Sequence, residues 1–236
     1  MFDTIDSRWP DPVQKRLADL SAHPERLNTR VASINGAAPL ETRNRLLSMS
    51  MKSTKVAQRI FWLRREADLV IQASVNVVAC KSGCSACCKI GVMVSEAEAA
   101  VIAQEIGMPV AEPPANVCAI TDLELGLDEA MERNAVISDE FFNTPCSFLN
   151  DEQQCGIYQH RPMACRHQIN LDDDPLLCQL EDGGGIPVPY LNMTASKTAY
   201  LMALGPNKKM ADIRHFFPAT VTRSWLQTRN AKQVGQ

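Results

Sequence analysis

Apolar residues recur at helical spacing through a stretch from Glu41 to Ser82 that contains no Gly and no Pro. Positions separated in this way share one face of a helix. They are Leu46, Met49, Val56, Ile60, Leu63, Ala67, Val70 and Val77. The pattern predicts one long helix, or two consecutive helices, leading straight into a dense group of cysteines.

Helix signals also flank this stretch. Upstream, Asp11 to Leu20 reads as a short helix with Asp11 as N-cap and Pro12 at the first helical position. A connector is expected around Asn35-Gly36 and Pro39, because these residue types interrupt helices. The N-terminal region is therefore expected to be helical, with one break before the long apolar stretch.

Two capping boxes follow the cysteines. Ser95-Glu-Ala-Glu98 precedes an apolar run over residues 99–106 and predicts a helix closed by Gly107. Thr121-Asp-Leu-Glu124 repeats the signature before Leu125 to Val136, although Gly126 lies inside that run. Both segments are therefore predicted helices.

The pattern changes between Asn143 and Pro189, where cysteines, prolines, an acidic tract and three consecutive glycines replace periodic apolar residues. Helical spacing returns in Thr194 to Leu204 and again beyond Pro218. These features predict a mainly α-helical, single-domain protein with an irregular, Cys-rich, metal-binding loop region. Its parts are an N-terminal helical region (1–79), a cysteine-cluster region (80–180) and a C-terminal helical tail (181–236) within one globular unit.

The charge pattern excludes several classes of function. The net charge is −3, and basic and acidic residues are interspersed, which gives no electrostatic footprint for nucleic acid. The longest apolar runs are far shorter than the roughly 20 residues that a membrane span requires, so we expect no membrane segment. No phosphate-binding loop, dinucleotide fingerprint, zinc-protease motif or serine-hydrolase elbow is present.

The nine cysteines are better explained by a metal than by disulfide bonds. The N-terminus lacks a cationic segment followed by an apolar one, so a reduced, cytoplasmic location is expected. With 45% hydrophobic residues, the chain can bury an ordinary core without covalent cross-links. Thiols at this density in a reducing compartment indicate metal ligands.

Spacing shows that the first group, Cys80, Cys84, Cys87 and Cys88, cannot form one complete site on an intact helix. All four side chains would share a face, but the outer ones would lie roughly 12 Å apart along the axis, whereas opposite sulfurs on a tetrahedral Zn(II) are separated by about 4 Å. A break at Gly83 would let Cys84 and Cys87 form a C-x-x-C knuckle. The adjacent Cys87 and Cys88 would most easily serve two metals, or one metal and one cluster edge.

The remaining ligands are predicted in the second group, Cys146, Cys155, Cys165 and Cys178. Four plus four thiolates fit two four-thiolate sites or one shared multinuclear site. Thiolate ligation selects Zn(II), Fe–S clusters or Cu(I), and Zn(II) is the leading expectation, with Fe or an Fe–S cluster as the alternative.

Other residues near the cysteines are assigned by context. Lys81, Lys89, Arg161 and Arg166 flank the cysteines and would offset thiolate charge or lie exposed in solvent. His160 and His167 flank Cys165 as lesser candidates for imidazole ligands. Cys118 is expected to be a structural thiol, because it lies apart from both groups.

Three runs resemble the YkgJ-type cysteine-cluster family, whose signature is C-x-x-C-x-x-C-C. They are Cys80-Lys-Ser-Gly-Cys-Ser-Ala-Cys-Cys88, Thr144-Pro-Cys-Ser-Phe-Leu149 and Cys155-Gly-Ile-Tyr-Gln-His-Arg-Pro-Met-Ala-Cys-Arg166. The resemblance covers Cys80 to Cys178 and implies a zinc- or iron-chelating domain. This chain departs from the signature by placing three residues, not two, between Cys80 and Cys84.

The leading functional hypothesis is metal binding at largely closed sites that stabilise the fold. The competing class is an Fe–S or multinuclear iron redox enzyme, because some relatives resemble flagellin lysine methylases; Tyr158, His160 or His167 would then line an open metal position. A third class is a metal-dependent interaction module that docks an unidentified protein partner through the helix over residues 41–79. Whether the chain is an enzyme stays open at this point.

Overall fold

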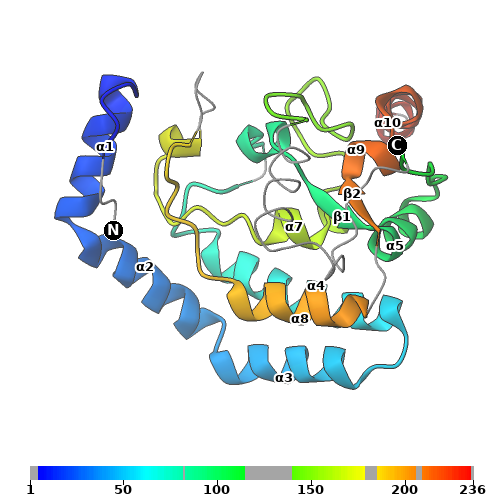
Figure 1. The fold of residues 1–236 in the computed structure, drawn as a ribbon, viewed down its shortest axis with the longest axis horizontal. Helices are drawn as coiled ribbons and strands as arrows, with labels where there is room; N and C mark the ends of the chain where they lie inside the picture. Colours follow the sequence, from blue (N-terminus) through cyan, green and yellow to red (C-terminus); the bar gives the residue numbers. More distant parts are fainter. Residues whose placement is uncertain (1–4, 82, 115–139, 179–184, 206–208, 235–236) are drawn as a thin grey trace, which may run out of the picture.

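The computed structural model describes residues 5–81, 83–114, 140–178, 185–205 and 209–234 (Figure 1). This part of the chain is mainly α-helical, which confirms the predicted fold class. The predicted helix after Thr121 and the isolated Cys118 lie outside the described residues. Within the described part, no helix is long and apolar enough to cross a membrane.

Two helices begin the fold, α1 (Asp11–Ala22) and α2 (Pro24–Ala37). Helix α1 confirms the predicted element, but Pro10 occupies the N-cap position and Asp11 is the first helical residue. The connector expected around Asn35-Gly36 and Pro39 is confirmed at Ala38 and Pro39, but Asn35 and Gly36 belong to α2. A glycine inside a helix costs about 1 kcal/mol, and burial of Leu27 and Ile34 on the same helix outweighs that cost at about 1.5–3 kcal/mol each.

The long apolar stretch forms two helices, α3 (Leu40–Lys52) and α4 (Val56–Ser74). The expectation of consecutive helices is confirmed, but they do not lead straight into the cysteines. Helix α4 ends at Ser74, whose hydroxyl donates to the carbonyl of Ile71 and whose carbonyl accepts from Val77. The chain beyond Ser74 leaves the helical path, so the first cysteine group is held by tertiary contacts.

Helix α4 lies at the centre of the helical layer and contacts α2, α3, α5 (Glu96–Ile106), α7 (Met163–Arg166) and α8 (Thr194–Leu204). Its residues Ile60, Leu63, Ala67 and Val70 are fully buried. Figure 1 shows α3 and α8 running alongside it. The apolar face that predicted this helix is therefore used inside the protein.

Helix α5 confirms the first capping box. Ser95 Oγ accepts a hydrogen bond from the amide of Glu98, and Gly107 closes the helix in the left-handed conformation, with φ 67°. The Glu98 carboxylate does not return to Ser95, however. It accepts hydrogen bonds from the Met163 amide (2.9 Å) and the Tyr200 hydroxyl (2.7 Å), and so joins α5 to α7 and α8.

Two strands that the sequence pattern did not predict, β1 (Met93–Ser95) and β2 (Met210–Asp212), pair antiparallel. Met93 pairs with Asp212 and Ser95 with Met210. Each strand has three residues, which is too short for an alternating pattern to show. The pair joins the segment after the first cysteine group to the C-terminal part of the chain, where α9 (Ile213–Phe216) and α10 (Ala219–Val234) follow.

The described part of the segment between Asn143 and Pro189 is irregular, as predicted. Its described part contains the short helical turns η2 (Tyr158–His160), α7 and η3 (Leu176–Cys178), and isolated bridges pair Leu149 with Cys155 and Asn170 with Tyr190. Few backbone hydrogen bonds of regular structure hold this segment. Its course depends on contacts with the helices around it.

Three hydrophobic clusters connect the irregular segment to the helices. The first joins α1, α2 and α4 to Ile169, Leu171 and Leu177. The second joins α5 and α9 to Phe148 and Ile157, and the third joins α4 and α8 to Met163. Each cluster therefore combines residues of the cysteine-cluster region with helices outside it.

An ionic contact fastens the N-terminal helices to the acidic tract. The guanidinium of Arg16 pairs with both Asp172 and Asp173, and Arg30 pairs with Asp173 at 2.7 Å. The Asp172 side chain is fully buried, and its carbonyl accepts from the amide of Ala79. Because Ala79 precedes Cys80, this contact also fixes the entry to the first cysteine group.

Candidate metal centre

The first cysteine group lies on a bent segment, not on a helix. Gly83 has φ +90°, a conformation that side-chain-bearing residues rarely adopt, and the 3₁₀ turn η1 (Ala86–Lys89) follows it. The bend lies between Cys80 and Cys84, and the turn that follows carries Cys87 and Cys88. This is the break at Gly83 that the spacing argument required.

The second group reaches the same place from four separate points of the chain. Cys146 lies on a loop, and its backbone amide donates a hydrogen bond to the carbonyl of Cys88 (2.7 Å). Cys155 lies on the bridge with Leu149, Cys165 on α7, and Cys178 at the end of η3. All eight cysteines are partly buried free thiols.

Three adjoining cavities are lined by these thiols. The large cavity, of about 220 Å³, is lined by Cys80, Cys84, Cys87 and Cys178 among others. The small cavity, of about 40 Å³, is lined by Cys84, Cys87, Cys88, Cys146, Cys155 and Cys165. The third cavity, of about 50 Å³, is lined by Cys80, Cys84, Cys87 and Cys165 together with Arg161. The structure therefore brings all eight predicted residues around connected spaces.

The cysteines divide unequally between these cavities. Cys178 lines the large cavity and neither of the other two. Cys88, Cys146 and Cys155 line only the small cavity. Cys84 and Cys87 line all three. Cys88 therefore faces the small cavity, and the adjacent Cys87 borders that cavity and the other two.

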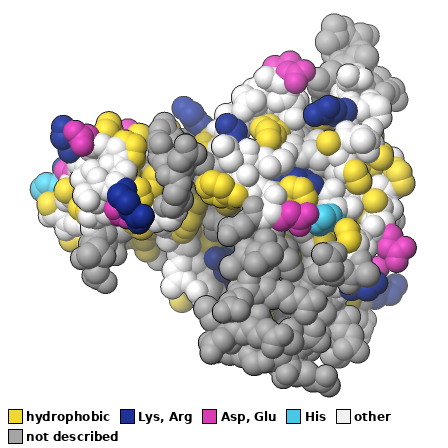
Figure 2. Space-filling model, turned by 45° about the horizontal axis from the view of Figure 1, so that its top comes forward, with side chains coloured by type: hydrophobic (Ala, Val, Ile, Leu, Met, Phe, Trp, Pro, Cys, Tyr) yellow, Lys and Arg dark blue, Asp and Glu magenta, His cyan; other side chains and the backbone are white. Residues whose placement is uncertain are grey.

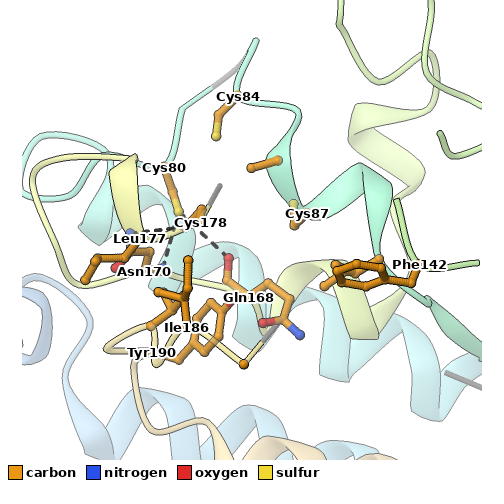
Figure 3. Close-up of a pocket in the computed structure, with 14 residues that line it drawn as sticks. Cys80, Cys84, Cys87, Phe142, Gln168, Asn170, Leu177, Cys178, Ile186 and Tyr190 are labelled. Atoms are coloured by element: carbon orange, nitrogen blue, oxygen red, sulfur yellow. Dashed lines mark hydrogen bonds between the residues drawn. The ribbon is translucent and has the colours of Figure 1, made fainter. Parts of the chain in front are cut away.

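Asn170 positions two of the thiols beside the large cavity (Figure 3). Its backbone amide donates to Sγ of Cys80 and its side-chain amide donates to Sγ of Cys178, both at 3.3 Å. The Cys80 thiol also lies 3.9 Å from the carbonyl oxygen of Gln168. Donors directed at sulfur are the contacts that stabilise thiolates and orient metal ligands, and no sequence signal singled out Asn170.

Burial makes most of these thiols hard to ionise without a cation. It raises the pKa of Cys146 to about 11 and that of Cys178 to about 12. It also raises the pKa of Cys80, Cys155 and Cys165. Because neighbouring thiolates repel one another, a full set of ionised sulfurs needs a bound cation.

The adjacent pair behaves differently. A hydrogen bond between the side chains lowers the pKa of Cys87 and raises that of Cys88. Cys87 is then the thiol that ionises first, with Cys88 as its donor. The two neighbouring sulfurs are therefore in direct contact.

Arg161 supplies positive charge to both groups. It lines the small and third cavities, and its guanidinium carbon lies 3.8 Å from the centre of the Tyr158 ring. Its charge opposes the effect of burial on the pKa of Cys80, Cys155 and Cys165. Arg161 therefore does what the sequence argument expected of a flanking cation.

Of the other flanking cations, Lys81 and Arg166 line the third cavity, and Lys89 is half-buried at the end of η1. Arg166 is buried, pairs with Asp68 and donates to the carbonyl of Gln159 at 2.6 Å. Lys81 is exposed. Arg166 therefore fixes the turn η2, and its charge also opposes the effect of burial on the pKa of Cys155.

Arg214 is a positioning residue that sequence reasoning missed. Its buried guanidinium donates to the carbonyls of Cys88 (3.2 Å), Ile90 (3.3 Å) and Thr144 (2.6 Å), and pairs with Asp212 at 2.9 Å. It thereby holds the backbone after Cys88 against the backbone before Cys146. Its distance in sequence from every cysteine left no signal by which to find it.

The two histidine candidates make contacts outside the thiol groups. His160 Nδ1 lies 3.0 Å from a carboxylate oxygen of Glu105, and His167 Nε2 lies 3.0 Å from the hydroxyl of Ser196. Burial lowers the pKa of His167 to about 4, so its imidazole is neutral at pH 7. Tyr158, the third residue considered for an open metal position, lines the small and third cavities.

The donor set fits a thiophilic metal. Eight thiols surround the cavities, and thiolates prefer Zn(II), Cu(I) and iron–sulfur centres over hard cations. As the side chains are placed, no three His, Cys, Asp or Glu residues of the described part form a ready-made metal site. The fit therefore rests on donor chemistry and on the shared cavities.

Comparison with protein families decides the class of this region. Residues 79–179 match the CxxCxxCC family model, described as a putative zinc- or iron-chelating domain. This region of the chain is therefore similar to the CxxCxxCC family. The match confirms the resemblance seen in the cysteine runs, and the matched region spans all eight cysteines described above. Searches of curated proteins and of solved structures each found no match.

Proposed function

We propose that the protein chelates two metal ions at two four-thiolate sites. The large-cavity site consists of Cys80, Cys84, Cys87 and Cys178, and the small-cavity site consists of Cys88, Cys146, Cys155 and Cys165. The observation that carries this proposal is the division of the thiols, because Cys178 lines one cavity while Cys88, Cys146 and Cys155 line the other. A chelating role agrees with the description of the CxxCxxCC family.

Zinc is the proposed metal. Closed four-cysteine sites of small volume suit a tetrahedral ion without redox chemistry, and the small cavity of about 40 Å³ suits a closed site. Zinc would draw together turns that carry little regular structure. Its binding free energy would then contribute directly to folding.

The metal sites are proposed to couple the three parts of the chain into one globular unit. Asp172 lies between Cys165 and Cys178, and its side chain pairs with Arg16 of α1. Ordering of the cysteine turns would therefore stabilise the packing of residues 1–79. A reducing, cytoplasmic compartment is proposed as the place of action, because both sites need reduced thiols.

Iron, or an Fe–S cluster with a redox role, is the alternative that the same ligands support. The two are separated by purifying the protein without oxygen, recording its visible spectrum and measuring zinc, iron and acid-labile sulfide. The proposal predicts a colourless protein with about two zinc ions per chain. A brown protein with iron and sulfide would replace zinc by an Fe–S centre, and a protein without metal would overturn the chelating function.

A Cys87→Ser variant tests the ligand assignment, with Cys118→Ser as the matched control. Cys87 lines all three cavities, so its loss is expected to lower the metal content and the stability of the fold. Cys118 lies apart from both groups in the sequence, so its substitution is expected to leave the metal content unchanged. Equal metal content in the wild type and the Cys87 variant would contradict the assignment.

A further inference from the structure

The two proposed metal sites differ in how far solvent reaches the space around them. Among the described residues that line the small cavity, Gly83 alone is exposed. Five apolar residues of its wall are buried, namely Val92, Phe148, Ile157, Pro162 and Ile213. An ion in the small cavity would therefore be enclosed by packed side chains.

The large cavity opens to solvent on one side. Hydrophobic side chains reach the surface at several points of the face drawn in Figure 2. Two exposed hydrophobic residues of the protein, Phe142 and Tyr190, line the large cavity, and each is 42% accessible. The third exposed residue of its wall is Gly185. Solvent, and a chelator dissolved in it, can therefore approach the large-cavity site.

Hydrophobic packing holds the small-cavity cysteines in place. Cys146, Cys155 and Cys165 pack against the second hydrophobic cluster, which includes residues of α5 and α9. The amide of Cys146 also donates to the carbonyl of Cys88, and Arg214 donates to that same carbonyl. Removal of these sulfurs from an ion would require part of the core to open, which costs more free energy than movement at the surface.

Cys178 is held by fewer contacts. It lies at the end of the three-residue turn η3, its sulfur accepts a hydrogen bond from Asn170 (Figure 3), and it is not among the residues packed against the described hydrophobic clusters. The neighbouring Leu177 is buried and anchors the turn. Rotation about the Cα–Cβ bond of Cys178 would therefore move the sulfur while the backbone stays in place. The large cavity, of about 220 Å³, provides the space for this movement.

We propose that the large-cavity site holds an exchangeable metal ion, which leaves after Cys178 detaches, whereas the small-cavity site keeps a structural ion. A four-thiolate site has no vacant coordination position, so the loss of a ligand must come first. The ion leaves as Zn(II), and protons from solvent take its place on the released thiolates, so no oxidant or reductant is needed. This inference rests on the proposed function, because it assigns different lifetimes to the two proposed ions.

The experiment uses the full chain loaded with one stable isotope of zinc. An excess of a second zinc isotope is added, the protein is separated from free metal at intervals, and both isotopes are counted by mass spectrometry. Half of the bound zinc is expected to exchange at least about 100-fold faster than the other half, because opening of the core costs more free energy than rotation of one side chain. Cys178→Ser is expected to keep only the slowly exchanging ion.

Asn170→Ala tests the role of Cys178 without removing a ligand. The variant lacks the donor that orients the Cys178 sulfur, so the fast half is expected to exchange about tenfold faster or more. The slow half is expected to keep its rate. Asn192→Ala is the matched control, because Asn192 is exposed, and it is expected to change neither rate.

Val188→Trp tests the role of the cavity. The new side chain fills the space beside Cys178, and the fast half is expected to exchange about tenfold more slowly or less, because a packed side chain must then be displaced. Ile186→Phe serves the same purpose if the first variant does not fold. Val110→Trp adds the same bulk at an exposed position, 39% accessible, and is expected to change neither rate.

The outcomes separate this inference from the proposed function. A chain that holds two zinc ions with one common exchange rate overturns the inference and leaves chelation standing. Fast exchange of the ion that remains in Cys178→Ser also overturns it, because the exchangeable ion would then lie in the small-cavity site. A chain that holds no metal overturns both proposals.

Discussion

The side-chain amide of Asn170 donates a hydrogen bond to the sulfur of Cys178 at 3.3 Å. Asn170 is fully buried, and its backbone amide donates to Cys80 at the same distance. One residue thus orients two thiols that are separated by most of the region that matches the CxxCxxCC family. Its side-chain oxygen also accepts from the amide of Asp172 (2.9 Å), which continues the contact towards the N-terminal helices.

Asn170→Ala is expected to weaken metal binding at the large-cavity site. It removes the donor to Cys178, and loss of a partner that orients a ligand typically lowers metal affinity about 10–100-fold. Affinities are measured by competition with a chromogenic chelator, which distinguishes a weakly bound ion from a tightly bound one. Asn192→Ala is the control, because Asn192 is exposed and its side chain accepts a bond from Thr194 within the turn that begins α8. If both metal affinities of the Asn170 variant equal those of the wild type, the contacts of Asn170 do not contribute to metal binding.

Arg161→Gln is expected to weaken both sites. The substitution removes a positive charge that opposes the effect of burial on the pKa of Cys80, Cys155 and Cys165, so protons compete more strongly with the metal. We expect at least tenfold weaker binding at pH 7, measured by the same chelator competition. Arg65→Gln is the matched control, because Arg65 is exposed and stacks on Phe61 away from the thiols. Unchanged metal affinity in the Arg161 variant would contradict this electrostatic role.

Arg214→Met is expected to destabilise the fold and to affect the small-cavity site first. The change leaves buried Asp212 without its partner, which typically costs about 3–5 kcal/mol, and frees the carbonyls of Cys88 and Thr144. Arg214→Lys should not restore stability, because one ammonium cannot reach the several acceptors that the guanidinium holds. Unfolding in urea checks both variants, with Arg223→Met on the exposed face of α10 as control. A lysine variant as stable as the wild type would contradict the role of the Arg214 guanidinium in holding these carbonyls.

Metal binding is expected to weaken steeply as pH falls. Burial raises the pKa of Cys146 to about 11 and of Cys178 to about 12, so at pH 7 these thiols are protonated in the metal-free protein. Each ion must then displace about three to four protons, which calorimetry in buffers of different ionisation enthalpy counts directly. Binding without proton release would show that these thiols are not the ligands.

The metal-free protein is expected to show the opposite pH dependence in its stability. The folded-state pKa of these thiols lies above the ordinary value of 9.0, so their contribution to the free energy of unfolding is present below pH 9 and is lost as pH rises through about 11. Urea unfolding of the metal-free chain at pH 8 and pH 10.5 checks the sign. Greater stability at the higher pH would contradict the effect of burial on these groups.

Local signals predicted the regular elements well. Ser95 and Gly107 mark the two ends of α5 because capping depends on nearby residues. The strands β1 and β2 and the continuation of α2 through Gly36 could not be predicted in this way, because packing between distant segments decides them. The division of the chain into residues 1–79, 80–180 and 181–236 stays a prediction.

The sequence predicted the candidate metal ligands but not the residues that position them. Cysteine spacing identified eight residues that the structure places around connected cavities, and the geometry of a helix showed that one ion could not use the first group alone. Asn170, Arg214 and Tyr190 carry no local motif, and they reach the thiols only because the chain folds back on itself. The spacing of residues within one segment does not predict tertiary contacts of this kind.

The account depends most on the separation of Cys87 and Cys88 into different sites. Counting metal ions per chain in Cys178→Ser and Cys146→Ser, each purified without oxygen beside the wild type, tests this most directly. The account predicts about two ions in the wild type and about one in each variant. Cys178→Ser should lose the ion of the large-cavity site, and Cys146→Ser the ion of the small-cavity site. Loss of all metal from either variant, or a single ion in the wild type, would show one shared centre and contradict the division.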